Sequence, residues 1–545
     1  VGILLLGEQS TSEPLQAPEP VRGGIYTEAL VGSLQRLNPV LDFHNPVDRD
    51  IDRLIFSGLL RFDDRGIPQP ELAESWGVSK DGTIYNFALR PGIQWHDGEL
   101  LTSDDVLFTV ELLREGGDIV PEDLQEFWRE VEVVDLSAET IQFRLPEPFA
   151  PFPDYLTFGI LPAHLLADLT FEEITNSQSN LHPIGSGPYR FDRFIIENGE
   201  ITGVILSVFG DFYFDKPFIE QIVFLLYPDS YAALVAYQEG TVKGIGNVTP
   251  EILHDVLIEP ELLMYSGRKP ELMMIMFNLN NPQLAFFQEP VIRKALLMGL
   301  NRQRMVNEYL DGQGIIADGV ILPGTWAYFT GLENSGFDTA AAKLLIKEEG
   351  YLVGENGVFR EKEGLLFSFE LIYPDDDYHL VLAEAIQRDW SLLDIEVNLT
   401  PLPYDEIVNS RLESRSFEAA LVSLNMSRTP DPDPYPFWDQ AQATGGQNYS
   451  QWDNRMASEY LEQARITVDL SERARLYRNF QVIFNNEMPS LPLFYSVYTY
   501  AVDREIQGVR VGPVFDSSDR FGNILDWFLV AQSPDFIGDS TEDVE

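Results

Sequence analysis

Apolar residues recur with two different periods along the chain, and each period predicts one kind of element. In residues 83–90 (TIYNFALR) apolar and polar positions alternate, which is typical of a half-buried strand. Residues 131–148 continue this alternation on both sides of a polar centre and predict a hairpin with its turn near 137–139. Residues 46–63 instead have apolar positions at helical spacing, which predicts a helix that ends near Gly58.

The second half of the chain alternates between helical and strand patterns. Residues 271–280 (ELMMIMFNLN) form an almost unbroken apolar run, as expected of a strand buried on both faces. Residues 289–310 predict one long helix, and residues 490–503 predict a closing pair of strands. The alternation predicts an α/β fold of mixed sheets flanked by helices, with parallel strands in this half. Further strands are predicted at 23–32, 189–196, 203–210, 220–228, 365–374, 395–402 and 418–426, and helices at 230–240, 338–351, 378–393, 404–414 and, as a pair, within 458–488.

Residues 95–106 (WHDGELLTSDDV) look at first like a catalytic or metal-binding cluster. Their Asp-Gly pair is a turn dipeptide, because glycine tolerates positive φ and aspartate bonds its own backbone. Thr102 or Ser103 is a helix N-cap, and the two following aspartates lie in the first helical turn, where the helix dipole favours negative charge. His96 has no second histidine at ligand spacing. We therefore interpret the segment as structural.

Composition limits the function further. The chain has 545 residues, of which 44% are apolar, enough for a large core divided among several units. Its 87 acidic and 37 basic residues give a net charge of −50, so nucleic acid is not an expected partner, because phosphate binding needs a basic surface. The acidity is spread along the chain, which favours a solvated, self-repelling surface; a cationic ligand and a saline habitat are the alternatives.

Motifs of enzyme and metal chemistry are absent from the sequence. It has no cysteine, which excludes disulfides, thiol nucleophiles and zinc–thiolate sites. It has no nucleophile elbow, no phosphate-binding loop, no zinc-protease motif and no complete dinucleotide-binding glycine pattern. The six histidines include no two at helical ligand spacing, and the prolines of residues 429–435 (TPDPDPY) do not fit a calcium loop. The sequence thus predicts no catalytic residue, no metal site and no cofactor.

The two terminal segments differ from the rest of the chain. Residues 1–7 (VGILLLG) are apolar, and the residues that follow are polar and rich in proline. We predict that residues 1–21 are the end of a signal or membrane-anchor segment followed by a linker. Residues 531–545 form an acidic tail.

Residues 72–113 (LAESWGVSKDGTIYNFALRPGIQWHDGELLTSDDVLFTVELL) resemble the signature region of the extracellular solute-binding proteins of family 5. The family pattern is a Trp, a D-G-x-x-Y-x-F strand and then L-R-x-G-x-x-W-x-D-G-x-x-x-T-x-x-D-V. Residues 185–191 (GSGPYRF), 277–306 and 431–438 (DPDPYPFW) resemble later landmarks of the same family, in the same order. The resemblance covers about residues 22–530.

The resemblance implies a two-lobed, type II periplasmic-binding-protein-like fold with an inserted accessory domain, whose lobes close on a ligand by a hinge. By the family pattern, lobe I comprises residues 22–58, 185–270 and 490–530, the accessory domain residues 59–184, and lobe II residues 271–489. The implied function is that of an extracytoplasmic component of an ATP-driven importer. Its expected partners are a peptide or other small-molecule ligand and the membrane permease, and we expect a monomer.

The resemblance also implies where the ligand is bound. Ser33 follows the first strand of lobe I, and Asn247 matches an asparagine that helps to hold a peptide. The loop after a lobe II strand is where the family places an aspartate on the ligand's ammonium group, and a late strand lines the cleft. The residues predicted from these two segments are Asn425, Ser427, Arg428, Asp431, Asp433, Tyr495 and Tyr498.

One position departs from the pattern of the peptide-binding members. These members have the aspartate three residues before an acidic-Pro pair. Counted from the two Asp-Pro pairs of residues 431–434, that position is Arg428 or Pro430, and neither is acidic. The sequence therefore lacks the expected partner for a free peptide N-terminus, and an arginine there would favour a carboxylate or a sugar hydroxyl.

Other functions remain open at the level of the sequence. A secreted hydrolase would need a nucleophile and a base, or paired carboxylates, in the cleft. A ligand sensor or an exported chaperone would use the same scaffold without a permease. The ligand is open among peptides, oligosaccharides, opines and chelated nickel, because a fold does not determine a ligand. Nickel as a simple ion is the least expected, because no histidine cluster is present.

Overall fold

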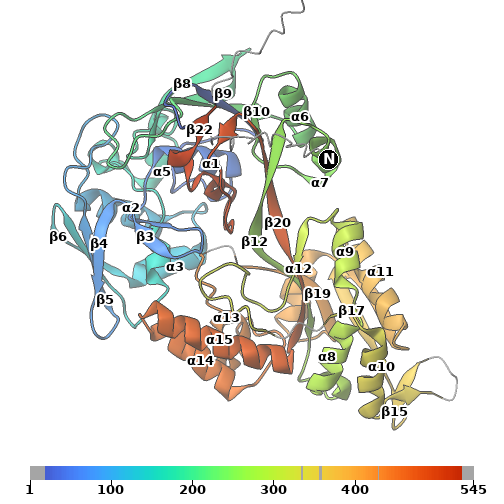
Figure 1. Ribbon diagram of the computed structural model, residues 1–545. Coiled ribbons are helices and arrows are strands. Elements are labelled where there is room, and N and C mark those ends of the chain that lie inside the picture. The colour runs from blue at the N-terminus through green and yellow to red at the C-terminus, as the bar shows by residue number, and fades with distance from the viewer. Residues whose placement is uncertain (1–18, 333–335, 355–358, 427–428, 531–545) are drawn as a thin grey trace, which may run out of the picture.

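A mixed sheet of eleven strands runs through the molecule, in a computed structural model that describes residues 19–332, 336–354, 359–426 and 429–530 (Figure 1). Helices cover both faces of this sheet, which confirms the predicted α/β class. The strands follow one another in the order β18 (Glu396–Leu402), β17 (Ser368–Pro374), β19 (Ala419–Asn425), β12 (Leu262–Phe277), β20 (Ser490–Asp503), β11 (Gly244–Ile245), β1 (Ile25–Val31), β10 (Gln221–Tyr227), β9 (Glu200–Val208) and β8 (Tyr189–Glu197), and β13 (Gly314–Ile316) pairs with β20 outside this order.

Strands β12 and β20 join the two ends of the sheet. Residues 262–268 of β12 pair antiparallel with residues 497–503, and residues 272–276 pair with residues 490–495. The register shifts between these two stretches, where Pro270 has no N–H to donate to the ladder. In Figure 1 the two strands run side by side down the middle, from the region of α6 to the region of α8. We call β11, β1, β10, β9 and β8 the first half-sheet, and β18, β17 and β19 the second half-sheet.

The first half-sheet is covered on both faces. Strand β1 lies parallel to β10 and β11, and antiparallel pairs continue the sheet to β8. Ala29, Ile245 and Ala501 face the core formed with α6 (Ser230–Gln238) and α7 (Pro250–Leu257). The opposite face packs against α1 (Pro46–Ile55) and the C-terminal segment. Strand β1 thus ends between two layers of helices, which fixes the position of its carboxyl end.

The second half-sheet also has two cores, and alternate residues of β12 enter them. Strand β17 lies parallel to β18 and β19, whereas β19 is antiparallel to β12. Each face of β12 packs against its own core, which explains why the apolar run is unbroken and confirms that this strand is buried on both sides. Met273, Ile275 and Phe277 pack on the side of α8 (Pro290–Met298), α9 (Arg302–Tyr309), α10 (Thr339–Glu348) and α11 (Asp377–Ser391), and Leu272, Met274 and Met276 on the side of α14 (Arg455–Ile466) and α15 (Leu470–Glu487).

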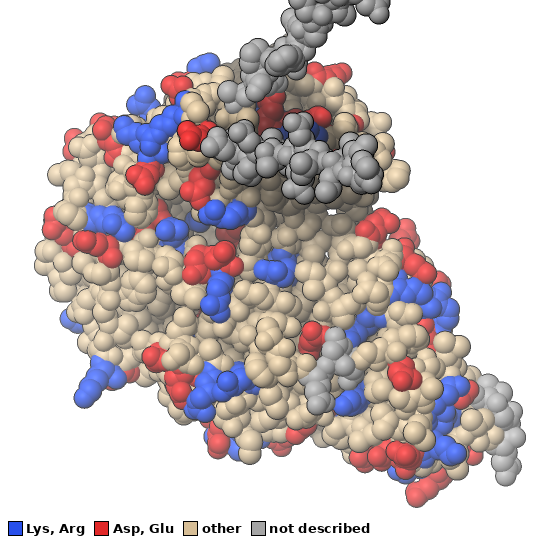
Figure 2. Space-filling model, in the orientation of Figure 1, with Lys and Arg blue, Asp and Glu red and all other residues tan. Residues whose placement is uncertain are grey.

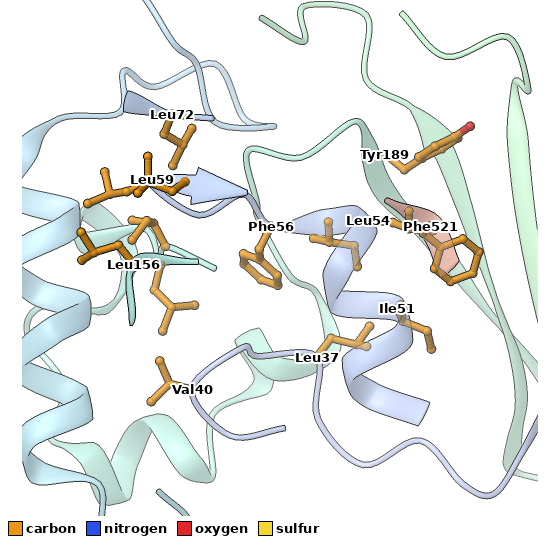
Figure 3. Close-up of a cluster of buried hydrophobic side chains, with 14 of the residues drawn as sticks. Leu37, Val40, Ile51, Leu54, Phe56, Leu59, Leu72, Leu156, Tyr189 and Phe521 are labelled. Carbon is orange, nitrogen blue, oxygen red and sulfur yellow. The ribbon is translucent and has the colours of Figure 1, made fainter. Parts of the chain in front are cut away.

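A separate sheet with its own helices packs beside α1, and we call residues 60–184 the four-stranded unit. Its strands, in order, are β4 (Ala73–Val78), β5 (Ile84–Leu89), β7 (Thr140–Arg144) and β6 (Glu132–Ser137), with α2 (Ser103–Glu115) and α3 (Glu122–Glu130) against them. The predicted strand and hairpin are confirmed. Figure 3 shows Phe56, at the end of α1, between Leu54 and Leu156, so one continuous core joins this unit to the first half-sheet.

The segment of residues 95–106 is structural, as predicted. Thr102 is the N-cap of α2, and the Asp105 carboxylate accepts hydrogen bonds from the backbone N–H groups of Thr102 (2.8 Å) and Ala163 (2.8 Å). His96 packs against the backbone of Gly187, and burial lowers its pKa to about 4. These contacts hold the start of α2 against the chain that leads back to the first half-sheet.

Three predicted boundaries were wrong. The helix predicted to end near Gly58 ends at Ile55, because the chain turns there into β2 (Leu60–Phe62). Gly58 does not end a helix: a Cβ atom at this residue would lie 2.7 Å from the Thr157 carbonyl oxygen, so glycine permits a close approach of two backbones.

The other two corrections concern residues 289–310 and 490–503. Residues 289–310 form two helices, α8 and α9, instead of one, because the Asn301 side chain accepts a hydrogen bond from the Arg304 N–H (3.0 Å) and caps a new helix. Residues 490–503 form one strand, β20, instead of a pair, because β12 offers it a partner along its whole length.

Shorter elements complete the described part of the chain, and none of its helices is long and apolar enough to cross a membrane. They are β3 (Pro68–Pro70), β14 (Leu352–Val353), β15 (Arg360–Lys362), β16 (Leu365–Leu366), β21 (Ile506–Gln507), β22 (Phe528–Leu529), α4 (Ala163–Leu166), α5 (Phe171–Thr175), α12 (Tyr404–Glu406) with the π-helical turn Ile407–Leu412, and α13 (Tyr435–Trp438).

A buried cation fixes the C-terminal segment to the first half-sheet. The Arg520 guanidinium is fully buried and donates hydrogen bonds to Glu28 of β1 (2.5 and 3.0 Å) and to Asp50 of α1 (2.9 Å). The Tyr26 and Tyr500 hydroxyls donate to the same Glu28 carboxylate (2.6 and 3.0 Å). Every charge in this cluster therefore has a partner, which is the condition under which buried charges are tolerated.

The substitution Arg520→Met is expected to lower the free energy of unfolding by about 3–5 kcal/mol, because it leaves two buried carboxylates without their cation. The matched control is Arg510→Met, which removes an exposed ion pair with Asp526 (2.7 Å) and should cost less than about 1 kcal/mol. Urea unfolding followed by circular dichroism measures both. Equal losses in the two variants would contradict the prediction.

Candidate ligand-binding site

One cavity lies against the irregular stretch of β12, and we call it the hinge cavity. It has a volume of about 400 Å³ and is lined by the carboxyl end of β1, the start of α1, residues 269–271 and residues 514–517. Asn247 and Tyr498, both predicted as ligand contacts, are part of this lining. Ligands of α/β sheets are commonly bound beyond the carboxyl ends of the strands, which is the position of this cavity.

The second cavity lies where α1, the four-stranded unit and residues 429–430 meet, and we call it the junction cavity. Its volume is about 440 Å³, within the range of small-molecule sites. Phe515 and Asp516 line both cavities, so the two lie on either side of this segment. Seven of its lining residues are aromatic: Phe43, Phe56, Phe62, Trp128, Tyr155, Phe158 and Phe515.

Acidic residues outnumber basic residues in the lining of the junction cavity. Arg49 pairs with Asp516 and with Asp42 (3.5 Å). Burial raises the pKa of Asp42 to about 8 and raises the pKa of Asp52 well above its usual range. The lining thus has a surplus of acid groups, some of which keep their proton near neutral pH. The charged residues of the lining are Asp42, Arg49, Asp52, Arg53, Asp154, Asp516 and Asp519.

Two of the predicted contacts, Asn247 and Tyr498, are brought together by the fold. Asn247 is exposed in the loop after β11. Tyr498 is 4% exposed, and its hydroxyl donates to the Gly246 carbonyl, which fixes the backbone next to Asn247. Asn425 is exposed at the end of β19, where it is the ladder partner of Glu271 in the hinge cavity lining.

Other predicted contacts lie elsewhere. Ser33 is exposed just after β1, and its carbonyl accepts a hydrogen bond from the Asn45 side chain (3.0 Å). Tyr495 is fully buried in the core of the second half-sheet, where its hydroxyl donates to the Gly319 carbonyl (3.0 Å). Ser427 and Arg428 are outside the described residues.

The two predicted aspartates of the Asp-Pro loop are engaged with arginines. The Asp431 carboxylate forms a buried ion pair with Arg473 (2.5 Å), and the Asp431 N–H donates to the Asp154 carboxylate of the four-stranded unit (2.7 Å). Asp433 pairs with Arg465 (3.2 Å), and burial raises its pKa to about 6. The loop thereby connects the second half-sheet to the four-stranded unit, and its role toward a ligand remains a prediction.

Sequence reasoning missed the junction cavity and its acid groups. Its lining comes from five segments that are distant in the sequence. One signal was present: Asp48 and Asp52 are four residues apart in α1, and two acids at this spacing destabilise a helix unless they have another role. Asp48 does have one, because it accepts hydrogen bonds from the N–H groups of Gln35 (2.8 Å) and Arg36 (2.9 Å). Asp52 has no comparable structural role.

Comparison with known proteins assigns the chain to a family. The model of the bacterial extracellular solute-binding proteins, family 5, matches residues 68–447. The chain belongs to this family of solute-binding transport proteins, which confirms the resemblance seen in the sequence.

Individual relatives agree with the assignment. The chain is 25% identical to the dipeptide-binding protein of Escherichia coli K12 over 467 residues, which cover 82% of this chain and 84% of that protein. It is 23% identical to the oligopeptide-binding protein AppA of Bacillus subtilis over 533 residues, which cover 96% and 93%. In structure it is similar to HbpA2 of Haemophilus parasuis, with a TM-score of 0.79 at 20% identity, over 91% of this chain and 99% of that one.

Asp52 has no hydrogen-bond partner among the described residues, and its raised pKa predicts that the stability of the protein depends on pH. Above about pH 4 the unfolded chain releases the Asp52 proton while the folded protein keeps it, so the free energy of unfolding falls by up to about 1.4 kcal/mol per pH unit until the raised folded pKa is reached. Asp52→Asn removes this contribution, and the variant should gain stability over the native protein as the pH rises from 4 to 8. Urea unfolding across this range measures the difference, with Glu111→Gln on the exposed face of α2 as the control. Parallel curves for the native protein and Asp52→Asn would show that Asp52 ionises freely.

Proposed function

We propose that this protein captures a peptide or a similar small solute between two hinged lobes and delivers it to the permease of an ATP-driven importer. The observation that carries the proposal is the position of the two cavities, where the halves of the sheet and the four-stranded unit meet. The names of the relatives, a dipeptide-binding and an oligopeptide-binding protein, support the solute class.

The proposed lobes follow the family pattern. Lobe I comprises residues 22–58, 185–270 and 490–530, with the accessory domain of residues 59–184, and lobe II comprises residues 271–489. The hinge is the irregular stretch of β12 with its partner β20, where the hydrogen-bond ladder is interrupted at Pro270. A solute that contacts both lobes only when they are closed shifts the population toward the closed state, and this shift is the signal for the permease.

The proposal includes several further points. The protein acts by binding and carries out no reaction; neither cavity has a histidine among its described lining residues. It works as a monomer outside the cytoplasmic membrane, and its predicted N-terminal anchor, within residues 1–21, lies almost entirely outside the described residues. Nucleic acid is not a partner: in Figure 2 the basic side chains are scattered among acidic ones. Among the described residues no group of three or more histidine and acidic side chains could hold a metal ion.

A thermal-shift screen tests the proposal with di- to pentapeptides, oligosaccharides, opines and chelated nickel. A solute at 100 times its dissociation constant should stabilise the protein by about 2.7 kcal/mol. Asn247→Ala should weaken the binding of that solute about tenfold and leave the ligand-free melting temperature unchanged, because this side chain is exposed in the hinge cavity. Asn307→Ala, on the exposed face of α9, is the control. Stabilisation by no member of the panel would contradict the proposal.

A further inference from the structure

Two buried polar side chains in the junction cavity have no partner among the described residues. Asp52 is 2% exposed, and no hydrogen bond reaches either of its carboxyl oxygens. The Trp128 side chain is fully buried, and its indole N–H has no acceptor. Both side chains line the cavity, one from α1 and the other from α3. Buried polar groups without a partner are rare in folded proteins, and each needs an explanation.

The groups around Asp52 do not supply the missing partner. The Asn38 N–H faces its carboxyl group and lowers its pKa less than burial raises it. Arg49, on the same helix, is already paired with Asp42 and Asp516. The other charged groups near it on α1 or around the cavity are Asp48, Arg53, Asp154 and Asp519. Most of these are acids, so the electrostatic field at Asp52 favours a cation.

We propose that the solute is an organic cation, an amine carried on an aromatic or apolar body, with its ammonium group bound by Asp52 beside Asp42. This inference rests on the proposed function and specifies the ligand. An ammonium group supplies the N–H donors that an ionised carboxylate accepts. The aromatic walls of the cavity suit both parts of such a solute, because they pack against an apolar body and attract a cation to their faces. The Trp128 indole N–H would donate to a hydroxyl or carbonyl oxygen of the same solute.

This site differs in position from the one expected from the peptide-binding members. There the ammonium group is held by an acid of the lobe II loop, and here that position is Arg428 or Pro430. The nearby Asp431 is in an ion pair with Arg473. The acid that lacks a partner lies in α1, so the cation is bound from lobe I.

Three probes of nearly equal size separate the chemistries: 2-phenylethylamine is a cation, 2-phenylethanol is neutral and phenylacetate is an anion. Isothermal titration of the full chain at pH 8 should give an affinity for the amine about tenfold or more above that for the alcohol, with phenylacetate the weakest. The dipeptide Phe-Phe and its N-acetyl derivative repeat the comparison on a larger body. Equal binding of charged and neutral probes would overturn the inference.

The variant Asp52→Asn keeps the shape of the side chain and removes its charge. It should lose about tenfold or more of the affinity for the amine and leave the affinity for the alcohol within about twofold. Glu111→Gln removes a charge from the exposed face of α2 and should change neither affinity. Unchanged amine binding in Asp52→Asn would overturn the inference.

The native protein provides a second test that needs no variant. The affinity for 2-phenylethylamine should rise by about threefold or more between pH 6 and pH 8, because the acid groups must release their proton to pair with the cation. The amine itself stays charged, since its pKa is close to that of lysine, about 10.4. A flat profile would count against the site.

The screen described above, extended with 2-phenylethylamine and N-acetylated peptides, distinguishes the two proposals. Stabilisation by sugars, N-acetylated peptides or chelates, but not by amines, would overturn the organic cation and leave the solute-binding function standing. Stabilisation by no solute of any class would overturn both.

Discussion

The antiparallel pairing of β12 with β20 is the constraint on which the other parts of the structure depend. Strand β20 pairs with β11 of the first half-sheet, and β12 pairs with β19 of the second, so the β12–β20 ladder joins the two halves. A ladder of this length is stiff, and the two halves can change their relative orientation most easily where it is irregular. Pro270 provides this irregularity by removing one backbone donor, and the residues beside it line the hinge cavity.

The same constraint places the candidate site. Strand β1 lies parallel to β10, and its carboxyl end faces the interrupted stretch of β12. The buried Arg520 cluster ties the C-terminal segment to β1 and α1, and this segment carries Phe515 and Asp516 into both cavities. The side chains that line the two cavities are therefore held by packed elements, which is the condition for a preorganised site.

The sequence allowed much of the fold to be predicted, because local patterns report local burial. The run of residues 271–277 is apolar on both faces since each face has its own core. The N-cap at Thr102 could be predicted from the residues next to it in the sequence. The errors arose where a distant segment determines the outcome. Residues 490–503 form one strand because β12 pairs with all of it, and Gly58 is required by a carbonyl about 100 residues away in the sequence, at Thr157.

The candidate site was less accessible to sequence reasoning for the same physical reason. Asn247 and Tyr498 were identified through a resemblance, and they do lie together in the hinge cavity. The junction cavity was not predicted, because apart from the spacing of Asp48 and Asp52 no local pattern indicates which of 87 acidic residues becomes buried without a partner.

Glu28 and Asp52 are both buried acids, but they differ in whether the fold supplies a partner for their carboxylate. Glu28 is fully buried and accepts hydrogen bonds from a guanidinium and two hydroxyls, so its charge is compensated within the fold. Asp52 is also buried and lacks such partners among the described residues, so its burial lowers the free energy of unfolding at neutral pH and no hydrogen bond compensates for it. A protein that already has a net charge of −50 gains nothing in solubility from one more acid in its interior. An uncompensated group retained at the wall of a cavity is better explained by a partner that arrives from outside, because strained or unsatisfied groups concentrate at sites where function opposes stability.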